Sequence, residues 1–113
     1  MVNVQFFKDK KGNYIKLISK GHSGFANRGQ DIVCSAISSA VIINVNGCIE
    51  VINVGHKIEQ KEGYLYFEII EEDLKKIDYC NILLESLYIG LTELMRLYPK
   101  NIKVEVKENE NYT

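Results

Sequence analysis

The longest apolar run of this chain, residues 32–54, limits the folds that are open to it. The run is too long for one strand of a small domain, and Asp31 immediately before it is a favourable N-cap for a helix that begins at Ile32. Residues 41–45, Val-Ile-Ile-Asn-Val, are rich in β-branched side chains and would suit a strand on propensity alone. The length and the cap favour a helix. Because this helix is apolar on nearly every side, we expect it to pack against a sheet and also against a second surface.

Segments of alternating apolar and polar residues lie on both sides of this run and predict two β-hairpins. The first pairs residues 2–7 with residues 14–19, and the second pairs residues 56–61 with residues 64–70 across the turn Glu62-Gly63. The alternating side chains expected to face the core are Val2, Val4, Phe6, Ile15, Leu17, Leu65, Phe67 and Ile69.

A second helix is predicted to begin at Asp73 or Asp78 and to end at Tyr98, because leucines recur at helical spacing and Pro99 follows. Residues 102–106 alternate again and predict a last strand. The order ββαββαβ indicates an α+β fold in which two helices lie on one face of a mostly antiparallel sheet. The 113 residues have room for one domain, which we expect at residues 1–107, followed by a polar, frayed tail at residues 108–113.

The charges of the chain nearly balance, with 14 basic and 15 acidic side chains and a net charge of −1. A bulk attraction to nucleic acid or anionic lipid is therefore not expected, although a local basic patch can still exist. We expect no direct DNA binding. Tyr64 and Tyr66 share one face of a predicted strand and could form an aromatic platform for RNA, but the balanced charge favours an ordinary half-exposed sheet face.

Several features of the sequence bear on its compartment. Serines, asparagines, a glycine and Glu50 interrupt the apolar run, which makes it a poor membrane span. Residues 1–5 lack the basic and then apolar layout of a signal peptide, and three cysteines do not suggest a secreted disulfide framework. We therefore expect a cytoplasmic protein without a membrane partner.

A glycine-rich loop leads directly into the start of the first helix and suggests nucleophilic chemistry. With Asp31 as N-cap, Cys34 is the third residue of the helix, where the positive end of the helix dipole favours a thiolate. First-turn N–H groups near Cys34 lack intrahelical partners and can serve as an oxyanion hole. His22 lies at the far end of the loop, from which an imidazole can take the thiol proton and later protonate a leaving amine.

Neighbouring residues have both structural and functional interpretations. Asp31 can orient His22 as the third member of a triad or can accept the Cys34 N–H as an N-cap, and we favour the cap because both roles need the same oxygens. Cys48 and Cys80 are interpreted as core or interface residues. A zinc site is not expected, because the chain lacks closely spaced ligand pairs. The candidates for a substrate loop and pocket are Gly21, Ser23, Gly24, Asn27, Arg28, Gly29 and Ser38.

The stretch GHSGFANRGQDIVCSAIS, residues 21–38, resembles the signature of the ribosomal-processing cysteine protease family, Prp. The resemblance implies that His22 is the catalytic histidine and Cys34 the nucleophile, without a cofactor. It further implies a cytosolic endopeptidase that removes the N-terminal extension of large-subunit ribosomal protein twenty-seven, cutting after an aromatic pair and before a small residue. The family fold is a two-layer α/β arrangement that dimerises through helices.

A second function stays open at this point. The chain can instead be a non-catalytic assembly factor that binds the nascent ribosomal protein or ribosomal RNA. In that case Cys34 is a packing residue, and its replacement by alanine should leave the activity intact.

Overall fold

A computed structural model describes residues 1–27 and 29–108 of the chain. The elements follow in the order β1 (Val2–Lys8), β2 (Tyr14–Lys20), α1 (Ile32–Asn46), η1 (Gly47–Val51), β3 (His56–Lys61), β4 (Tyr64–Ile69), α2 (Leu74–Leu97) and β5 (Ile102–Glu108). This confirms the predicted order ββαββαβ, with one addition: α1 continues directly into η1, a turn of π-helix.

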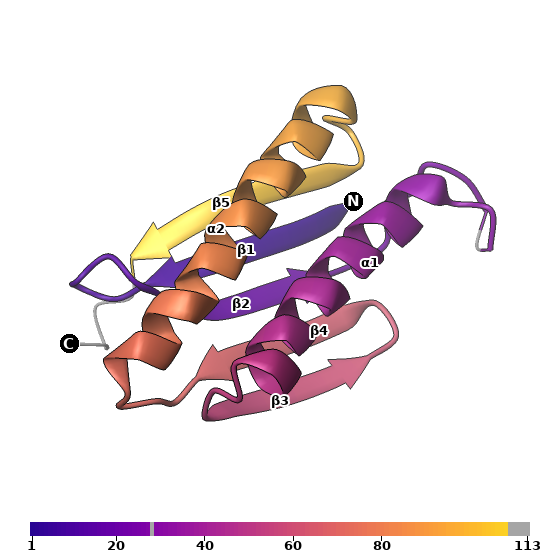
Figure 1. Ribbon diagram of the computed structural model, residues 1–113. Coiled ribbons are helices and arrows are strands. Elements are labelled where there is room, and N and C mark those ends of the chain that lie inside the picture. The colour runs from indigo at the N-terminus through magenta and orange to yellow at the C-terminus, as the bar shows by residue number, and fades with distance from the viewer. Residues whose placement is uncertain (28, 109–113) are drawn as a thin grey trace.

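The strands form one mixed sheet of five strands in the order β3-β4-β2-β1-β5. The pairs β1–β2, β2–β4 and β3–β4 are antiparallel, whereas β5 runs parallel to β1 along its whole length. Figure 1 shows α1 and α2 side by side on one face of this sheet. The predicted α+β class and the placement of both helices on one face are thus confirmed.

The core lies between the helices and the sheet. Its sheet side consists of the alternating residues predicted for the strands, among them Val4, Phe6, Leu17 and Phe67, which are all fully buried. The helices contribute one buried stripe each, spaced by three or four residues as helical periodicity requires. These stripes are Val33, Ile37, Val41 and Val45 on α1, and Cys80, Leu84, Leu87 and Leu91 on α2.

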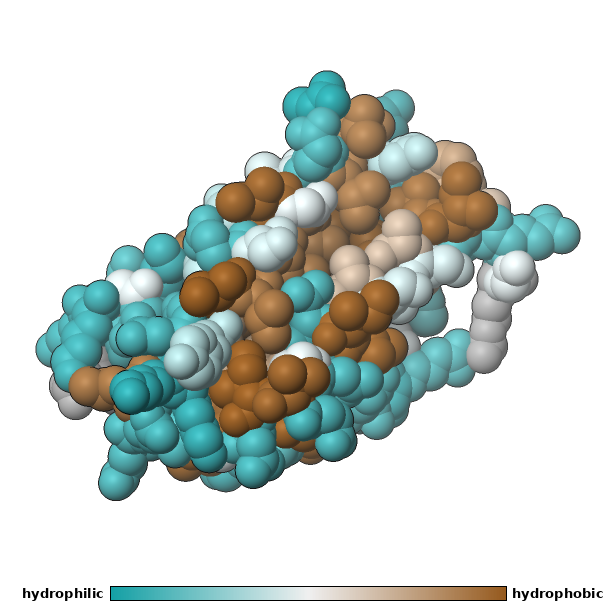
Figure 2. All heavy atoms as spheres, viewed as in Figure 1, coloured by the Kyte–Doolittle hydropathy of each residue, from teal (hydrophilic) through white to brown (hydrophobic). Residues whose placement is uncertain are grey.

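The solvent-facing side of both helices is also apolar in places. Ile43 on α1 and Ile82 and Ile89 on α2 are all more than half exposed. Figure 2 shows apolar side chains gathered over the helical face of the molecule. Length and composition alone would let Ile32–Val51 cross a membrane, which differs from the expectation of a poor span. The core helix of a globular domain meets the same criterion, and here its buried stripe packs against the sheet.

Strand β2 departs from simple alternation where it begins. The register shifts between Phe7 and Lys8, so that Phe7 pairs with Lys16 but Lys8 pairs with Tyr14. The bulge places the consecutive residues Tyr14 and Ile15 both in the core, whereas alternation predicted only Ile15 there. Asn81 of α2 satisfies the disturbed backbone: its side chain accepts from Tyr14 N (2.6 Å) and donates to Tyr14 O (3.1 Å).

Hydrogen bonds and strand pairing define two boundaries, the start of α2 and the end of β5. Asp73, one of the two predicted starts of the second helix, caps α2 by accepting from Lys75 N at 3.0 Å. Glu108, the first residue of the predicted tail, pairs with Lys8 as the last residue of β5. Residues 109–113 of that tail lie outside the described residues.

Candidate active site

The loop that carries His22 is fixed at its start by a glycine. Gly21 has φ +101°, and its N–H donates to the carbonyl oxygen of Gly63 at 2.8 Å, which ties the end of β2 to the β3–β4 turn. A Cβ on Gly21 would collide with the backbone oxygen of Met1. Both the positive φ and this close approach require glycine at the position before His22.

The end of the loop is held by the carboxylate of Asp31. Its Oδ1 accepts from the N–H of Cys34 at 2.8 Å, which confirms the predicted N-cap of α1. Its Oδ2 accepts from the hydroxyl of Ser23 and from the N–H groups of Phe25 (3.1 Å) and Ala26 (3.5 Å). One side chain therefore joins the loop containing His22 to the helix start containing Cys34.

The environment of Asp31 keeps it ionised. Removal from water alone would raise the pKa of this carboxyl, but the hydrogen bond from Ser23 and those from the N–H groups of Cys34, Ala26 and Phe25 outweigh that cost. The pKa of Asp31 is consequently held below its usual value. A charged Asp31 can accept several hydrogen bonds at once, which is what the loop requires of it.

The connection between α2 and β5 adds two anchors to the same loop. Asn101, immediately before β5, donates from its side chain to the Ser23 carbonyl oxygen at 2.9 Å. The ring of Phe25 meets that of Tyr98 edge to face, with centroids 5.5 Å apart. Ser23 is only 1% exposed, so this residue, predicted as a substrate contact, is instead a buried anchor of the loop.

His22 and Cys34 both line one cavity of about 410 Å³ at the start of α1. The other residues that line it are Gly24, Ala26, Gly29, Asp31, Ser35, Ser38 and Glu62. Of the residues predicted for a substrate loop and pocket, the cavity thus brings together Gly24, Gly29 and Ser38. Asn27 is not among its lining residues, and its carbonyl oxygen accepts from Gln30 N at 2.9 Å. Arg28 lies outside the described residues.

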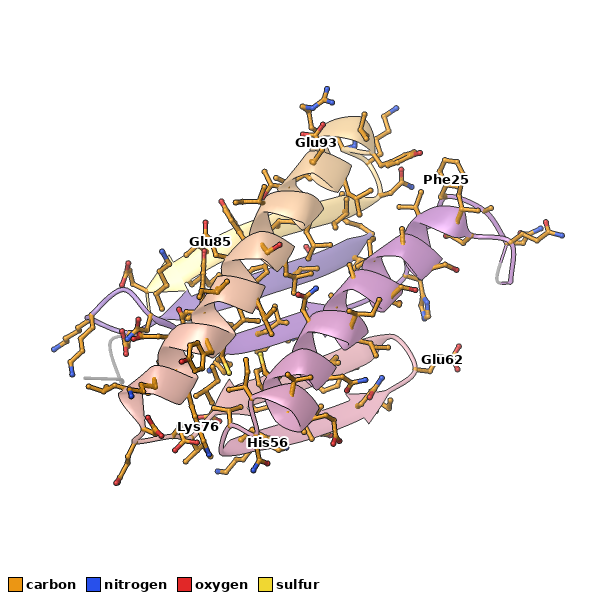
Figure 3. The ribbon with its side chains drawn as sticks, in the orientation of Figure 1. Phe25, His56, Glu62, Lys76, Glu85 and Glu93 are labelled. Atoms are coloured by element: carbon orange, nitrogen blue, oxygen red, sulfur yellow. The ribbon has the colours of Figure 1, made fainter. Side chains whose placement is uncertain are left out.

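The β3–β4 turn forms a wall of the site that the sequence analysis did not predict. The His22 ring lies so close to Gly63 that a Cβ there would be 2.9 Å from Nε2. Figure 3 shows Glu62 at the tip of the same turn, and Glu62 lines the cavity. The sequence assigned Glu62 and Gly63 only to a turn. They approach His22 because Lys20 of β2 pairs with Tyr64 of β4, a pairing that the sequence pattern does not specify.

One predicted detail of the chemistry needs correction. The N–H of Cys34 already donates to Asp31, so it is not free to donate to an oxyanion, as the sequence analysis expected of N–H groups in the first turn of the helix.

Cys34 itself is partly exposed, whereas Cys48 and Cys80 are fully buried outside the cavity, in keeping with their interpretation as core residues. Contact with the Cys80 thiol, together with burial, raises the pKa of Cys48 above its ordinary value. Among the residues that the structure describes, no group of three His, Cys, Asp or Glu side chains is arranged to hold a metal ion.

The site combines a partly exposed thiol at a capped helix start with an imidazole that lines the same cavity. This arrangement of nucleophile and base is typical of cysteine hydrolases. Comparison with known proteins agrees with this class. The family model described as "Cysteine protease Prp" matches residues 1–103, and the chain belongs to this family of cysteine proteases.

One relative supports the same assignment by sequence, and two solved structures share the fold. The ribosomal processing cysteine protease Prp of Bacillus subtilis (strain 168) is 32% identical over 87 residues, which cover 74% of this chain and 78% of that protein. A crystal structure of Prp from S. aureus with a covalently linked product peptide has a TM-score of 0.85 at 21% identity, over 95% of this chain and all of that one. A structure from Streptococcus mutans has a TM-score of 0.74 at 23% identity, over 96% of each chain.

Proposed function

We propose that this protease removes the N-terminal extension of a large-subunit ribosomal protein, number twenty-seven, with Cys34 as nucleophile and His22 as general base and acid. The observation that carries the proposal is the single cavity lined by both side chains. The name of the Bacillus subtilis relative refers to ribosomal processing, and the S. aureus protein has been crystallised with a substrate peptide and with a covalently linked product peptide.

The reaction proceeds through a covalent thioester. His22 takes the proton of the Cys34 thiol, and the sulfur attacks the carbonyl carbon of the scissile peptide bond. When the C–N bond breaks, His22 returns the proton to the leaving amine, and the new N-terminus departs. A water molecule then gives a proton to His22 and its oxygen to the carbonyl carbon, which releases the C-terminal carboxylate of the extension and regenerates the thiol.

The lining of the cavity suits a bulky substrate residue. Five of the nine residues that line the cavity of about 410 Å³ are small: Gly24, Ala26, Gly29, Ser35 and Ser38. This supports a cut after an aromatic pair, because an aromatic side chain needs a wide pocket with small walls. Gly24 and Gly29 have φ values of +70° and +87°, and a Cβ on either would meet no other atom within 4 Å. The loop can therefore clamp an extended substrate by changing its backbone, as glycines permit.

The apolar outer side of the helices supports a homodimer. Ile43, Ile82 and Ile89 are 68%, 66% and 61% exposed, and they lie on the two adjacent helices. An apolar patch that is exposed in a single chain often marks a site of protein–protein interaction. A second copy would cover this face by packing helix against helix, and it is the second surface that the sequence led us to expect for α1. The proposed compartment of the dimer is the cytoplasm.

The direct test is incubation with a synthetic peptide of the host's own ribosomal protein extension, followed by mass spectrometry. We expect one cut, which Cys34→Ser and His22→Ala both abolish. Cys48→Ala and His56→Ala serve as matched controls, because both residues lie outside the cavity, and they should cut at the wild-type position. Binding without cleavage, equal for the wild type and Cys34→Ser, would refute the protease mechanism and favour the assembly factor.

A further inference from the structure

The face of the sheet opposite the helices, here called the open face, has a chemical character of its own. Figure 1 shows that α1 and α2 both lie on the other side. On β1, β2 and β4 the residues between the buried ones project from the open face. Cross-strand pairing extends these rows onto the edge strands β3 and β5. The lysines among them are Lys16, Lys20, Lys57, Lys61, Lys103 and Lys107.

These lysines concentrate positive charge on a chain that is nearly neutral. The open face also carries three glutamates, Glu59, Glu68 and Glu105, so that its local charge is +3. The whole chain has a charge of −1, and the remaining residues therefore total −4. A balanced total thus conceals a local excess of positive charge on the open face, the kind of patch that composition alone cannot reveal.

The lysines are arranged in two rows rather than scattered. The register aligns Lys61, Lys20 and Lys103 across the sheet in one row, and Lys57, Lys16 and Lys107 in the other. Glu68 stands in the second row, between Lys57 and Lys16. The rows are four residues apart along each strand, a separation of about 13 Å. Between them lies a central row with Tyr66, Ile18 and Gln5 in its middle, while Glu59 and Glu105 stand at its two ends on the edge strands.

Aromatic rings stand next to the ammonium groups. Lys16 Nζ is 4.4 Å from the ring centroid of Phe7 and 5.9 Å from that of Tyr66, and Lys61 Nζ is 5.4 Å from that of Tyr64. All three rings are partly exposed on the open face. Each ammonium lies over one face of its ring, so a base that stacks on that face must displace the lysine. The displaced ammonium can then pair with the phosphate of that nucleotide.

We propose that the open face binds single-stranded RNA. The strand would run across the sheet between the two lysine rows, with phosphates near the lysines and bases on Tyr66, Tyr64 and Phe7, as on other sheet platforms for RNA. Five strands span about 19 Å, room for roughly four nucleotides. The amides of Asn3 and Gln5, on β1 between β2 and the edge strand β5, are placed to bond with ribose 2′-hydroxyls and base edges. None of the test positions below lines the cavity of Cys34, so the proposal stands apart from the protease mechanism.

The test is fluorescence anisotropy of a labelled, unstructured RNA of about 12 nucleotides, long enough to cover the face with flanks on both sides. The triple variant Lys57→Glu, Lys103→Glu, Lys107→Glu should weaken binding by more than about tenfold and make the salt dependence of log K shallower by about 2. The matched control is Lys10→Glu, Lys11→Glu, Lys100→Glu, which makes the same charge change at exposed lysines in turns. Tyr66→Leu should weaken binding about tenfold, and Tyr79→Leu on α2 should not.

The outcomes separate RNA from other partners. Equal loss of affinity in both lysine triples would overturn the proposal, because it would reduce the effect to net charge. Equal affinity for a DNA strand of the same sequence would overturn the assignment to RNA. Failure of the wild-type protein to bind RNA would overturn the whole proposal. If that protein instead sediments with phosphatidylglycerol vesicles through the same lysines, the face binds anionic lipid and not RNA. Circular dichroism melting of each variant verifies that the sheet remains folded.

Discussion

Gly63 lies directly against the ring of His22: a Cβ on Gly63 would be 2.9 Å from Nε2 and 3.2 Å from Cε1. Gly63→Ala should therefore displace the imidazole and lower kcat/KM for the extension peptide by about tenfold or more, equivalent to at least about 1.4 kcal/mol. Gly12→Ala is the matched control, since Gly12 also has a positive φ (+84°) but faces open space. Both variants should lose about 1–2 kcal/mol of stability from the positive φ, and only Gly63→Ala should lose activity. Equal activities would show that the turn does not position His22.

Asp31→Asn should separate capping from loop anchoring. Asparagine can still cap α1, but its amide cannot accept all the hydrogen bonds that Oδ2 now receives from Ser23, Phe25 and Ala26. We expect lower activity and a lower Tm at neutral pH. Asp73→Asn, at the N-cap of α2, controls for the change of cap alone and should remain active.

The pH dependence of that variant has a defined sign. The folded-state pKa of Asp31 is depressed, so its contribution to stability is present above the unfolded value, about 3.9, and is lost as the pH falls from there through the folded pKa. The Tm difference between the wild type and Asp31→Asn should stay constant near neutrality and shrink below about pH 4. Thermal melts from neutral to acidic pH measure this difference, and a difference that grew on acidification would contradict the assigned shift.

The proposed dimer predicts a response to charge on the outer face of α2. Ile82 and Ile89 are seven residues apart on one side of the helix, so Ile82→Asp with Ile89→Asp would place two carboxylates in a helix–helix interface. Light scattering after size exclusion should show a dimer for the wild type and a monomer for the double variant. Ile70→Asp, at an exposed residue between β4 and α2, should remain dimeric. A monomeric wild type at all concentrations would refute the dimer.

The three cysteines should differ sharply toward iodoacetamide. Cys34 is partly exposed, while Cys48 and Cys80 are fully buried and the pKa of Cys48 is raised. The native protein should gain one adduct by mass spectrometry, the urea-unfolded protein three, and native Cys34→Ser none. Rapid labelling of native Cys34→Ser would mean that the core around Cys48 and Cys80 opens readily.

The elements of the fold could be predicted because local physics specifies them. Asp31 caps α1 by a bond between residues three apart, and period-two alternation identifies the buried sides of β1 and β4. The π-turn η1 was not predicted from local patterns. It packs closely against α2, which comes later in the sequence, and a Cβ on Gly47 would be 2.9 Å from Leu83 Cδ1. The parallel pairing of β1 with β5 likewise joins the two ends of the chain, where periodicity carries no information about partners.

The candidate site was predictable to a similar extent. One contiguous stretch of sequence carries both His22 and Cys34, which made them candidates, and both line the cavity. Glu62 and Gly63 were not assigned to the site, because they reach it only through the order in which β4 follows β2 in the sheet. Ser23 was assigned to substrate although its hydroxyl serves Asp31, a contact that depends on how the loop folds back on itself.

The parallel pair β1–β5 has a consequence for biosynthesis. Translation delivers β1 first and β5 last, so one side of β1 keeps unpaired N–H and C=O groups until the final strand emerges. Asn101, which holds the backbone of Ser23 from its position immediately before β5, arrives equally late. A nascent chain that has not yet exposed β5 therefore lacks one support of the His22 loop. We expect the protease to become active only once β5 has emerged and paired with β1, which keeps an unfinished copy from cutting other proteins.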